Sequence, residues 1–265
     1  MTSAADCSAA LLGVALRCCG KPSNRLLRCN GNQSCCAGSP ISIELVTWRP
    51  GMVRPDPTDR SQWSVVIPAL QEAHQLPSLL AQLQGPEEVW VVDGGSTDGT
   101  GQIARLMGAH WLRSPASRGV QLRAGAAQAT RPWLLFLHAD ARLPRDWSAA
   151  LAAELHDPSV AAAAFRLRIH HQGWKLRLLE WLVDWRCWSR GLPYGDQGLA
   201  LGADVYQRSG GYQPIALMED LDLVQRLHSY GRVVLAPAAV HVSARRWARL
   251  GVWRSSWRNA ALRRA

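Results

Sequence analysis

The chain has 265 residues, 48% of them hydrophobic, which is enough to bury the core of one α/β domain with appendages. It contains no run of about eighteen uncharged apolar residues, so the sequence indicates no transmembrane helix. The net charge of +10 is unevenly placed. Nine of the 30 basic residues are arginines that follow Asp222, where no acid occurs, and the other 21 nearly balance the 20 acids.

Residues 1–60 are expected to form a disordered, cysteine-rich extension. Six of the seven cysteines lie in the first 36 residues, but none forms the Cys-x-x-Cys pair typical of structural zinc; a metal or disulfide module is the alternative. Many Ser, Gly, Asn and Pro residues leave little to bury. The apolar stretch 9–16 has no basic residue before it and makes a poor signal peptide, so we expect a cytoplasmic protein.

Strands and helices are predicted to alternate from about residue 61. Three continuous apolar runs, which end in a proline or a carboxylate, predict buried strands at 63–68, 87–93 and 134–140. Three helix-like stretches lie at 73–84, 98–107 and 119–129. This alternation predicts an open, mostly parallel α/β sheet whose ligand site lies outside the carboxyl ends of the strands.

Asp140 ends the most apolar of these runs. A charge is costly inside a buried strand, so we expect Asp140 at the carboxyl end, where a ligand crevice opens. A carboxylate there can hold a divalent metal, and the metal can hold a diphosphate. His138 would share a face with Asp140, because side chains two residues apart in a strand point the same way. The alternative is a surface aspartate at a turn.

Five motifs occur in the order typical of one enzyme family. They are 68–72 (Pro-Ala-Leu-Gln-Glu), 92–98 (Val-Asp-Gly-Gly-Ser-Thr-Asp), 118–119 (Arg-Gly), 138–140 (His-Ala-Asp) and 219–220 (Glu-Asp). From about residue 61 to 247 the chain therefore resembles the inverting glycosyltransferase family 2. The resemblance implies the GT-A fold, a Rossmann-like, mostly parallel sheet with flanking helices in a single domain, which we expect at 61–243. It also implies nucleotide-diphosphate sugars as donors.

A narrower resemblance concerns two of the motifs. The His-Ala-Asp form at 138–140 and the segment 194–198 (Tyr-Gly-Asp-Gln-Gly) are similar to a bacterial subfamily linked to arsenosugar biosynthesis. The usual metal motif of the wider family is Asp-x-Asp, so the histidine leaves open whether His138 is a ligand or only supports one. Histidine suits manganese better than magnesium, and we expect one of these two ions. His241 is a candidate third ligand, with a structural histidine as the alternative.

The resemblance also implies residues that bind the nucleotide. Asp93 would contact the base, although it also suits a turn before two glycines. Glu72 would line the nucleoside pocket, or act only as a first-turn helix acid. Arg118 would bring positive charge to an anion at a helix N-terminus, or be an unpaired surface arginine. The full set consists of Pro68, Glu72, Asp93, Asp98, Arg118 and Gly119.

Glu219 and Asp220 precede an apolar helix face and are candidates for acid–base chemistry. Two acids in a first helical turn are stabilised by the helix dipole, which accounts for them without any function. By resemblance, Asp220 is the general base that takes the proton of the acceptor hydroxyl, with Glu219 beside it. Asp196, with Gln197 next to it, is an alternative acid and is expected on the acceptor side.

Two tryptophan-rich segments lie outside these motifs. A predicted helix carries Trp174, Trp181, Trp185 and Trp188, for which core packing is expected and a lipid-linked acceptor site is the alternative. Residues 244–265 predict a basic amphipathic helix, which could lie on an anionic membrane as a peripheral contact or pack on the domain. No nucleic-acid-binding motif accompanies these basic residues, so we expect no nucleic-acid partner.

Together these features predict an inverting, metal-dependent glycosyltransferase that uses a small-molecule or lipid-linked acceptor. One alternative is a nucleotidyltransferase, which shares a similar sheet and a metal carboxylate. It should carry a glycine-rich basic loop after its first strand, and 68–72 has neither glycine nor lysine. The other alternative is a catalytically inactive nucleotide-sugar-binding protein, against which the intact pair of acids at 219–220 argues.

Overall fold

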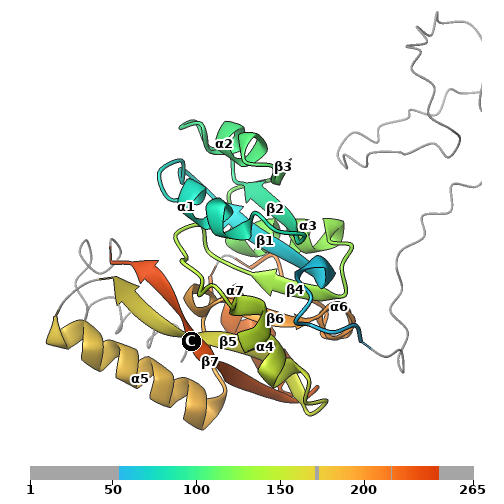
Figure 1. Cartoon of the computed structure of the whole chain (residues 1–265), viewed down its shortest axis with the longest axis vertical. Coiled ribbons are helices and arrows are strands. Elements are labelled where there is room, and N and C mark those ends of the chain that lie inside the picture. Colours follow the sequence, from blue (N-terminus) through green and yellow to red (C-terminus); the bar gives the residue numbers. More distant parts are fainter. Residues whose placement is uncertain (1–53, 171–172, 216, 245–265) are drawn as a thin grey trace, which may run out of the picture. The chain divides into compact units, whose positions relative to one another are not determined.

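A mixed seven-stranded sheet forms the centre of the fold in the computed structural model (Figure 1). The structure describes residues 54–170, 173–215 and 217–244. The strand order is β3-β2-β1-β4-β6-β5-β7. The strands are β1 (Trp63–Ala69), β2 (Glu88–Asp93), β3 (His110–Arg113), β4 (Trp133–Phe136), β5 (Val160–His170), β6 (Leu199–Gly202) and β7 (Arg232–Ser243). The first four are mutually parallel, β6 is antiparallel to both its neighbours, and β5 and β7 are parallel to each other.

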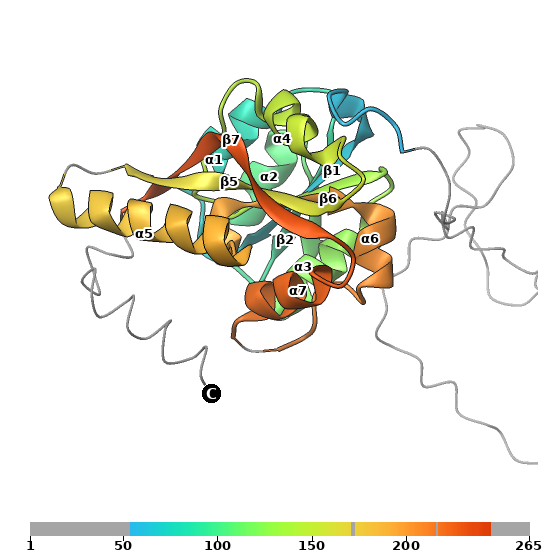
Figure 2. The same cartoon turned by 90° about the horizontal axis from the view of Figure 1, so that it is seen from below.

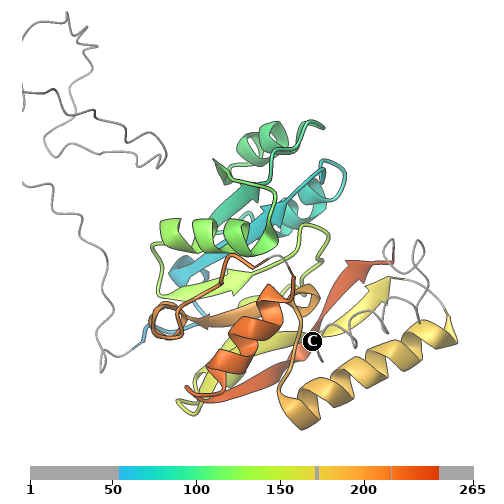
Figure 3. The ribbon, with the colours of Figure 1, turned by 180° about the vertical axis from the view of Figure 1, so that it is seen from behind.

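Helices cover both faces of the sheet. One apolar cluster joins the sheet to α1, α2 and α4, and a second joins its other face to α3, α6 and α7 (Figure 3). A third, smaller cluster packs α5 against β5 and β7 (Figure 2). The helices are α1 (Leu76–Leu80), α2 (Thr100–Leu106), α3 (Arg118–Gln128), α4 (Trp147–Leu155), α5 (Trp174–Arg190), α6 (Ala203–Arg208) and α7 (Glu219–Leu227), with short 3₁₀ turns at Arg60–Gln62, Ala81–Leu83 and Gly195–Gln197.

Gly125 shows how closely α3 approaches the parallel strands. A Cβ atom at this position would lie 2.4 Å from Cγ1 of Val66 on β1 and 2.9 Å from Cγ2 of Val92 on β2. Real Cβ atoms do not come so close, so only glycine allows this contact between helix and sheet. The C-terminal half of α3 is thereby held against β1 and β2.

The predicted alternation of strands and helices is confirmed. The strands expected at 63–68 and 87–93 are β1 and β2, and the three helix-like stretches contain α1, α2 and α3. The third predicted strand is shorter than expected, because β4 ends at Phe136. The chain then turns: the amide of Ala141 donates to the carbonyl of His138 at 3.0 Å. His138 and Asp140 therefore lie in a turn, and the alternation of side chains along a strand does not apply to them.

The domain begins before residue 61. The carbonyl of Pro57 accepts a hydrogen bond from Nε1 of Trp63 at 2.8 Å, and Arg54 pairs with Asp204 at 3.0 Å. Residues 54–60, which we assigned to the extension, thus belong to the domain. The extension expected before residue 54 and the amphipathic helix expected after 244 lie outside the described residues. Within the described ranges no helix has both the length and the apolar character needed to cross a bilayer.

The tryptophans of α5 correct another prediction. Core packing was expected for Trp174, Trp181, Trp185 and Trp188, and all four are exposed. The helix instead buries Leu176, Glu180, Val183 and Cys187. The sequence pattern of apolar residues at steps of three and four is typical of a buried stripe, but here a second, mixed stripe on the opposite side makes the contact with the sheet.

Candidate active site

Three loops meet at the carboxyl ends of the parallel strands, where the sequence predicted the ligand site. The loop after β1 is tied to the loop after β2, because the amide of Gln71 donates to Oγ of Ser96 at 2.9 Å and the amide of Glu72 donates to Oγ1 of Thr100 at 3.0 Å. The loop after β4 joins them through Arg142, whose Nη2 donates to Oε1 of Gln75 at 3.1 Å. These bonds hold the three loops together as one wall of the site.

Asp93, expected to contact the nucleotide base, sits at the end of β2 and is buried. One carboxylate oxygen accepts the amides of Gly95 and Ser96, at 3.1 and 2.8 Å, which forms a turn. The other oxygen accepts Nε1 of Trp111, at 3.3 Å. The turn-forming role that we weighed as the alternative is therefore present. The contact with the base stays a prediction, and it would use the less occupied oxygen.

Asp98 ties two loops together. Its carboxylate accepts the amide of Ala73 at 3.0 Å and the amide of Thr100 at 3.1 Å. Burial raises the pKa of this carboxyl, but the hydrogen bonds from Thr100 and Ala73 outweigh it, so the pKa lies below its ordinary value. Asp98 is thus held ionised as a structural tie between the loops after β1 and β2, and its expected contact with the nucleotide stays a prediction.

The proposed metal ligands come from two segments that are paired. His138 and Asp140 are half-buried in the turn after β4. His241 lies within the long strand β7. Its backbone pairs with that of Arg142, at 2.8 and 2.9 Å, so β7 runs beside the turn that carries Asp140.

The donor set of this region suits a partly open metal site. Over the described ranges no three His, Cys, Asp or Glu side chains converge on a point that could hold an ion. A closed protein cage is therefore not present among them. Magnesium and similar ions are commonly held by one or two carboxylates together with substrate phosphates, and Asp140 fits that arrangement. The two histidines would favour manganese.

Arg118 and Gly119 begin α3 and face the acids of α7. Nη1 of Arg118 lies 3.3 Å from Oε1 of Glu219 and 3.9 Å from Oδ2 of Asp220. A Cβ at Gly119 would lie 2.3 Å from the carbonyl oxygen of Gln213, so glycine is needed for this close approach. Arg118 is therefore not the unpaired surface arginine of our alternative. Its charge is already directed at two carboxylates.

Asp220 lies in the most unusual electrostatic setting of the site. Its side chain is 13% exposed, and the pKa of this carboxyl is raised to about 7, chiefly by burial. The carboxylates of Glu219 and Asp196 also contribute to this rise, while Arg118 and the hydroxyl of Tyr212 oppose it. Oη of Tyr212 lies 3.3 Å from Oδ1 of Asp220 and donates to it. A carboxyl with a pKa near neutrality is suited to accept a proton at physiological pH.

The turn 195–197 lies directly against Asp220. A Cβ at Gly195 would lie 2.3 Å from Oδ2 of Asp220, so the backbone here forms a wall of the pocket around the carboxylate. Asp196 is half-buried and acts electrostatically on Asp220. Gln197 is fully buried, and its amide is bonded to the carbonyl of Phe165 and the amide of Tyr194. We therefore leave Gln197 out of the proposed acceptor contacts and keep Asp196.

Two residues next to this site adopt left-handed backbone conformations that are unfavourable for side chains with a Cβ. Gln71, in the loop after β1, has φ of 56°, and Met218, directly before Glu219, has φ of 64°. They are the two positive-φ residues other than glycine among the described residues. Strain of this kind costs about 1–3 kcal/mol and persists where the surroundings or the function demand it. At Met218 this left-handed conformation sets the direction in which the chain enters the first turn of α7.

Sequence reasoning missed two residues that shape the site. Tyr212 is buried, and its ring centroid lies 4.9 Å from that of Phe136 at the end of β4. Tyr212 thus links Asp220 to the end of β4. Nε2 of Gln121 on α3 bridges the carbonyls of Ala69 and Val92, at 2.9 and 2.8 Å, where β1 and β2 end. A lone tyrosine and a glutamine in a helix carry no local sequence signal for these roles.

Comparisons with known proteins agree with this geometry. A model of glycosyl transferase family 2 matches residues 64–211. An uncharacterized glycosyltransferase of Mycobacterium bovis is 29% identical over 167 residues, which cover 58% of this chain and 76% of that protein. A PGL/p-HBAD biosynthesis glycosyltransferase of the same species is 37% identical over 111 residues, covering 37% of this chain and 43% of that protein.

Solved structures share the fold. A mannosyltransferase from Pyrobaculum calidifontis, solved with GDP-Man and Mn²⁺, has a TM-score of 0.57 and 22% identity and covers 73% of this chain. TarS from S. aureus, residues 1–349, has a TM-score of 0.54 and 17% identity and covers 69% of this chain. The chain spans 60% of the length of each of these two. At such identities the likeness is one of fold.

Proposed function

The chain belongs to glycosyl transferase family 2, and from this premise we propose that it moves a sugar from a nucleotide-diphosphate donor to an acceptor hydroxyl with inversion at the anomeric carbon. That it is a glycosyltransferase of the GT-A fold follows from the family and the fold. The nucleotidyltransferase alternative loses its support with this membership. An inactive binding protein would show no turnover, and the experiment below measures turnover.

The proposal is carried by the acid pair at the start of α7. Asp220 combines a pKa of about 7 with a nearly buried carboxylate, so it can hold a proton that it takes from an acceptor hydroxyl. Tyr212 donates to one of its oxygens and Gly195 closes against the other, which leaves the carboxylate in one orientation. An in-line attack by the deprotonated hydroxyl, opposite the departing diphosphate, inverts the anomeric centre.

The remaining residues divide into a donor side and an acceptor side. On the donor side, Asp93 would accept from the base, and the loop of Pro68 and Glu72 would line the nucleoside pocket. Asp140, together with His138 of the same turn and His241 of the edge strand, would hold a divalent ion, which when bound would neutralise diphosphate charge. On the acceptor side, Asp196 acts electrostatically on the proposed base.

Arg118 has a second role in this proposal. It lies 3.3 Å from Glu219 and 3.9 Å from Asp220, so it offsets the repulsion between the two carboxylates. An incoming diphosphate would compete for the same guanidinium. Withdrawal of Arg118 toward the diphosphate would raise the proton affinity of Asp220, because Arg118 is a group that lowers its pKa. Binding of the donor would thereby prepare the base.

Three finer parts of the proposal rest on sequence motifs or composition. The link to arsenosugar biosynthesis depends on 138–140 and 194–198. The choice of manganese depends on the histidines. The cytoplasmic location and the peripheral membrane contact through residues 244–265 depend on the composition of segments that lie largely outside the described residues.

Slow transfer of the sugar to water tests the proposal without knowledge of the acceptor. The chain is incubated with a panel of GDP- and UDP-sugars and manganese, and the anomer first released is read by proton NMR before mutarotation. An α-linked donor should release the β-sugar. Release of the α-sugar would contradict inversion, and no release from any donor, in the presence of simple alcohols as acceptors, would favour an inactive binding protein.

A further inference from the structure

The outward side of α5 carries a continuous stripe of large apolar side chains. The exposed fractions of its tryptophans are 70% for Trp174, 61% for Trp181, 50% for Trp185 and 83% for Trp188. Leu178 completes the stripe at 37%. These residues are separated by four, three, four and three positions, so they fall on one side of the helix along its whole length of about 25 Å. A stripe this large on a protein surface marks an interaction site.

The stripe is separate from the face that holds α5 on the domain. That face carries Leu176, Val183 and Cys187, which pack with Leu167 and Val242 of the strands. The fold of the helix is therefore already secured without the tryptophans. The tryptophans take no part in the packing of α5 on β5 and β7, so we expect them to contact a partner.

Charge decides between the candidate partners. Lys175 and Arg190 are exposed on the helix. Its two acids are engaged within the domain: Glu180 is bonded to Arg177 and the amide of Ile169, and Asp184 is bonded to Arg168. A second copy of α5 would bring bases against bases. The segment 245–265 has seven arginines and no acid, so it also lacks complementary charge.

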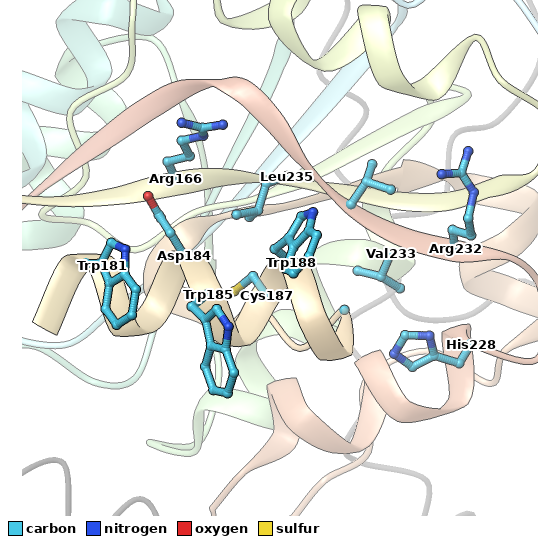
Figure 4. Close-up of a pocket in the computed structure, with 12 residues that line it drawn as sticks. Arg166, Trp181, Asp184, Trp185, Cys187, Trp188, His228, Arg232, Val233 and Leu235 are labelled. Atoms are coloured by element: carbon cyan, nitrogen blue, oxygen red, sulfur yellow. The ribbon is translucent and has the colours of Figure 1, made fainter.

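A hollow between α5 and the edge strands adds basic groups beside the stripe. It has a volume of about 610 Å³ and is lined by Trp181, Trp185 and Trp188 on the helix side (Figure 4). Arg166 of β5 and Arg232 of β7 line its strand side. Arg232 also pairs with Asp157 at 2.7 Å, and Asp184, which lines the helix side, pairs with Arg168, so Arg166 is the base on which phosphate binding chiefly depends. Tryptophan rings favour the boundary between acyl chains and headgroups, and arginines favour phosphate. This combination matches the surface of an anionic phospholipid bilayer.

We propose that α5 docks the domain on an anionic membrane, with its tryptophan stripe at the level of the headgroups and the hollow beside it accepting lipid phosphates. The docking requires no transmembrane helix, because an amphipathic helix lies in the plane of the interface. It is also independent of the glycosyl transfer proposed above, since none of the residues of the acid pair or of the three loops takes part.

The test uses the full chain and a double variant, Trp181→Ala with Trp185→Ala. Both side chains are exposed, so the variant should keep its fold, which circular dichroism and thermal unfolding verify. Binding is measured by co-sedimentation with vesicles of phosphatidylcholine and phosphatidylglycerol, and with vesicles of phosphatidylcholine alone. Leu106→Ala is the control, because Leu106 is an exposed apolar residue of α2, 85% accessible and remote in the fold from α5.

We expect the wild type and the control to sediment with the anionic vesicles and to be released as salt rises. The double variant should bind them at least ~10-fold more weakly, through the loss of two interfacial tryptophans. Equal binding of double variant and wild type would overturn the proposal and leave the segment 245–265 as the attachment. No binding by the wild type would overturn it too. A dimer in light scattering that the double variant abolishes, with vesicle binding unchanged, would assign the stripe to a second copy.

Discussion

Aspartates on the donor side and the acceptor side of this site are held in opposite states. Asp98 accepts three hydrogen bonds from Thr100 and Ala73, and its pKa lies below the ordinary value. Asp220 is buried among other carboxylates, and its pKa is raised to about 7. The same side chain thus serves as a fixed anion in one region and as a proton acceptor in the other, and the balance between burial, neighbouring carboxylates and hydrogen-bond donors decides which.

The difference extends to stability. The donor-side loops are tied by satisfied hydrogen bonds and should contribute to the free energy of unfolding. Each region contains one left-handed residue, Gln71 on the donor side and Met218 on the acceptor side, so the difference in free energy comes from the buried acid pair of the acceptor side. Function of the proposed kind needs both regions, since the donor must be held in place while the base must remain able to change its charge.

The largest expected effect is a loss of turnover, and it should distinguish two acids of α7, Asp220 and Asp222, that differ in environment. Asp220→Asn should fold and bind donor but turn over ~100-fold more slowly or worse, because a general base is lost. Asp222→Asn is the matched control, since Asp222 lies on the same helix and pairs with Arg226. Steady-state rates of nucleotide release measure both. Near-normal turnover of Asp220→Asn, with strong loss in Glu219→Gln or Asp196→Asn, would move the base role.

A second effect concerns stability as a function of pH. The folded pKa of Asp220 lies above its ordinary value of 3.8, so the folded state binds the proton more tightly and the wild type loses stability as pH rises from about 4 to 7. Asp220→Asn removes this loss, so its stability relative to the wild type should increase between pH 5 and pH 8.

Asp98→Asn gives the opposite sign in the same experiment. The pKa of Asp98 is lowered, so its ionised form stabilises the fold above pH 3.8, and this contribution is lost as pH falls through the folded pKa. The Asp98→Asn variant should therefore be less stable than the wild type at neutral pH. Urea unfolding at pH 5 and pH 8 measures the free energy of unfolding of both variants. If both variants changed this free energy equally and with the same sign, the contrast between Asp98 and Asp220 would be wrong.

A third effect tests the metal-side turn. Asp140→Ala should weaken manganese-dependent binding of GDP or UDP by more than ~10-fold, because the diphosphate would lose its counter-ion. Binding without metal should change little. Isothermal titration with and without manganese checks this, and Asp146→Ala, which removes another acid that follows the same turn, is the control. Wild-type affinity in the Asp140→Ala variant would show that Asp140 is not a metal ligand.

The smallest effect refines the setting of the base. Tyr212→Phe removes the hydroxyl that donates to Asp220 at 3.3 Å, and since this bond lowers the pKa of Asp220, the pKa should rise. At pH 7 less of the base would be ionised, and kcat/KM should fall about 3-fold if the lost hydrogen bond is worth about 1 kcal/mol. The acid limb of the pH profile should move to higher pH, and full activity should return near pH 9.

The donor half of the molecule was easier to predict from the sequence than the acceptor half. The strands β1 and β2 are apolar runs with local turn signals, so their ends and the residues Asp93 and Asp98 could be located from sequence alone. The sequence also proposed the pair Glu219 and Asp220 as site residues. Its environment was not, because Tyr212, Gly195 and Arg118 reach it from three separate segments, and only the tertiary fold brings them together.

Two errors have a common physical cause. We expected the strand to continue through His138 to Asp140 at its carboxyl end, because the run 134–140 is apolar. Instead β4 ends at Phe136, and a hydrogen bond between Ala141 and His138 that composition does not reveal forms a turn. We expected the tryptophans of α5 to be buried because their spacing is helical. Spacing identifies an apolar face and does not identify what covers it, and in α5 the opposite face packs on the sheet.

The most direct test of this contrast is the titration of the carboxyl groups by ¹³C NMR, with Asp220→Asn and Asp98→Asn used to assign the two signals. We predict that Asp220 titrates with a midpoint near pH 7 and that Asp98 titrates below its ordinary value of 3.8. The measurement needs neither donor nor acceptor. A midpoint for Asp220 near pH 4, like that of an exposed aspartate, would contradict the claim that the fold keeps this carboxyl poised as a base.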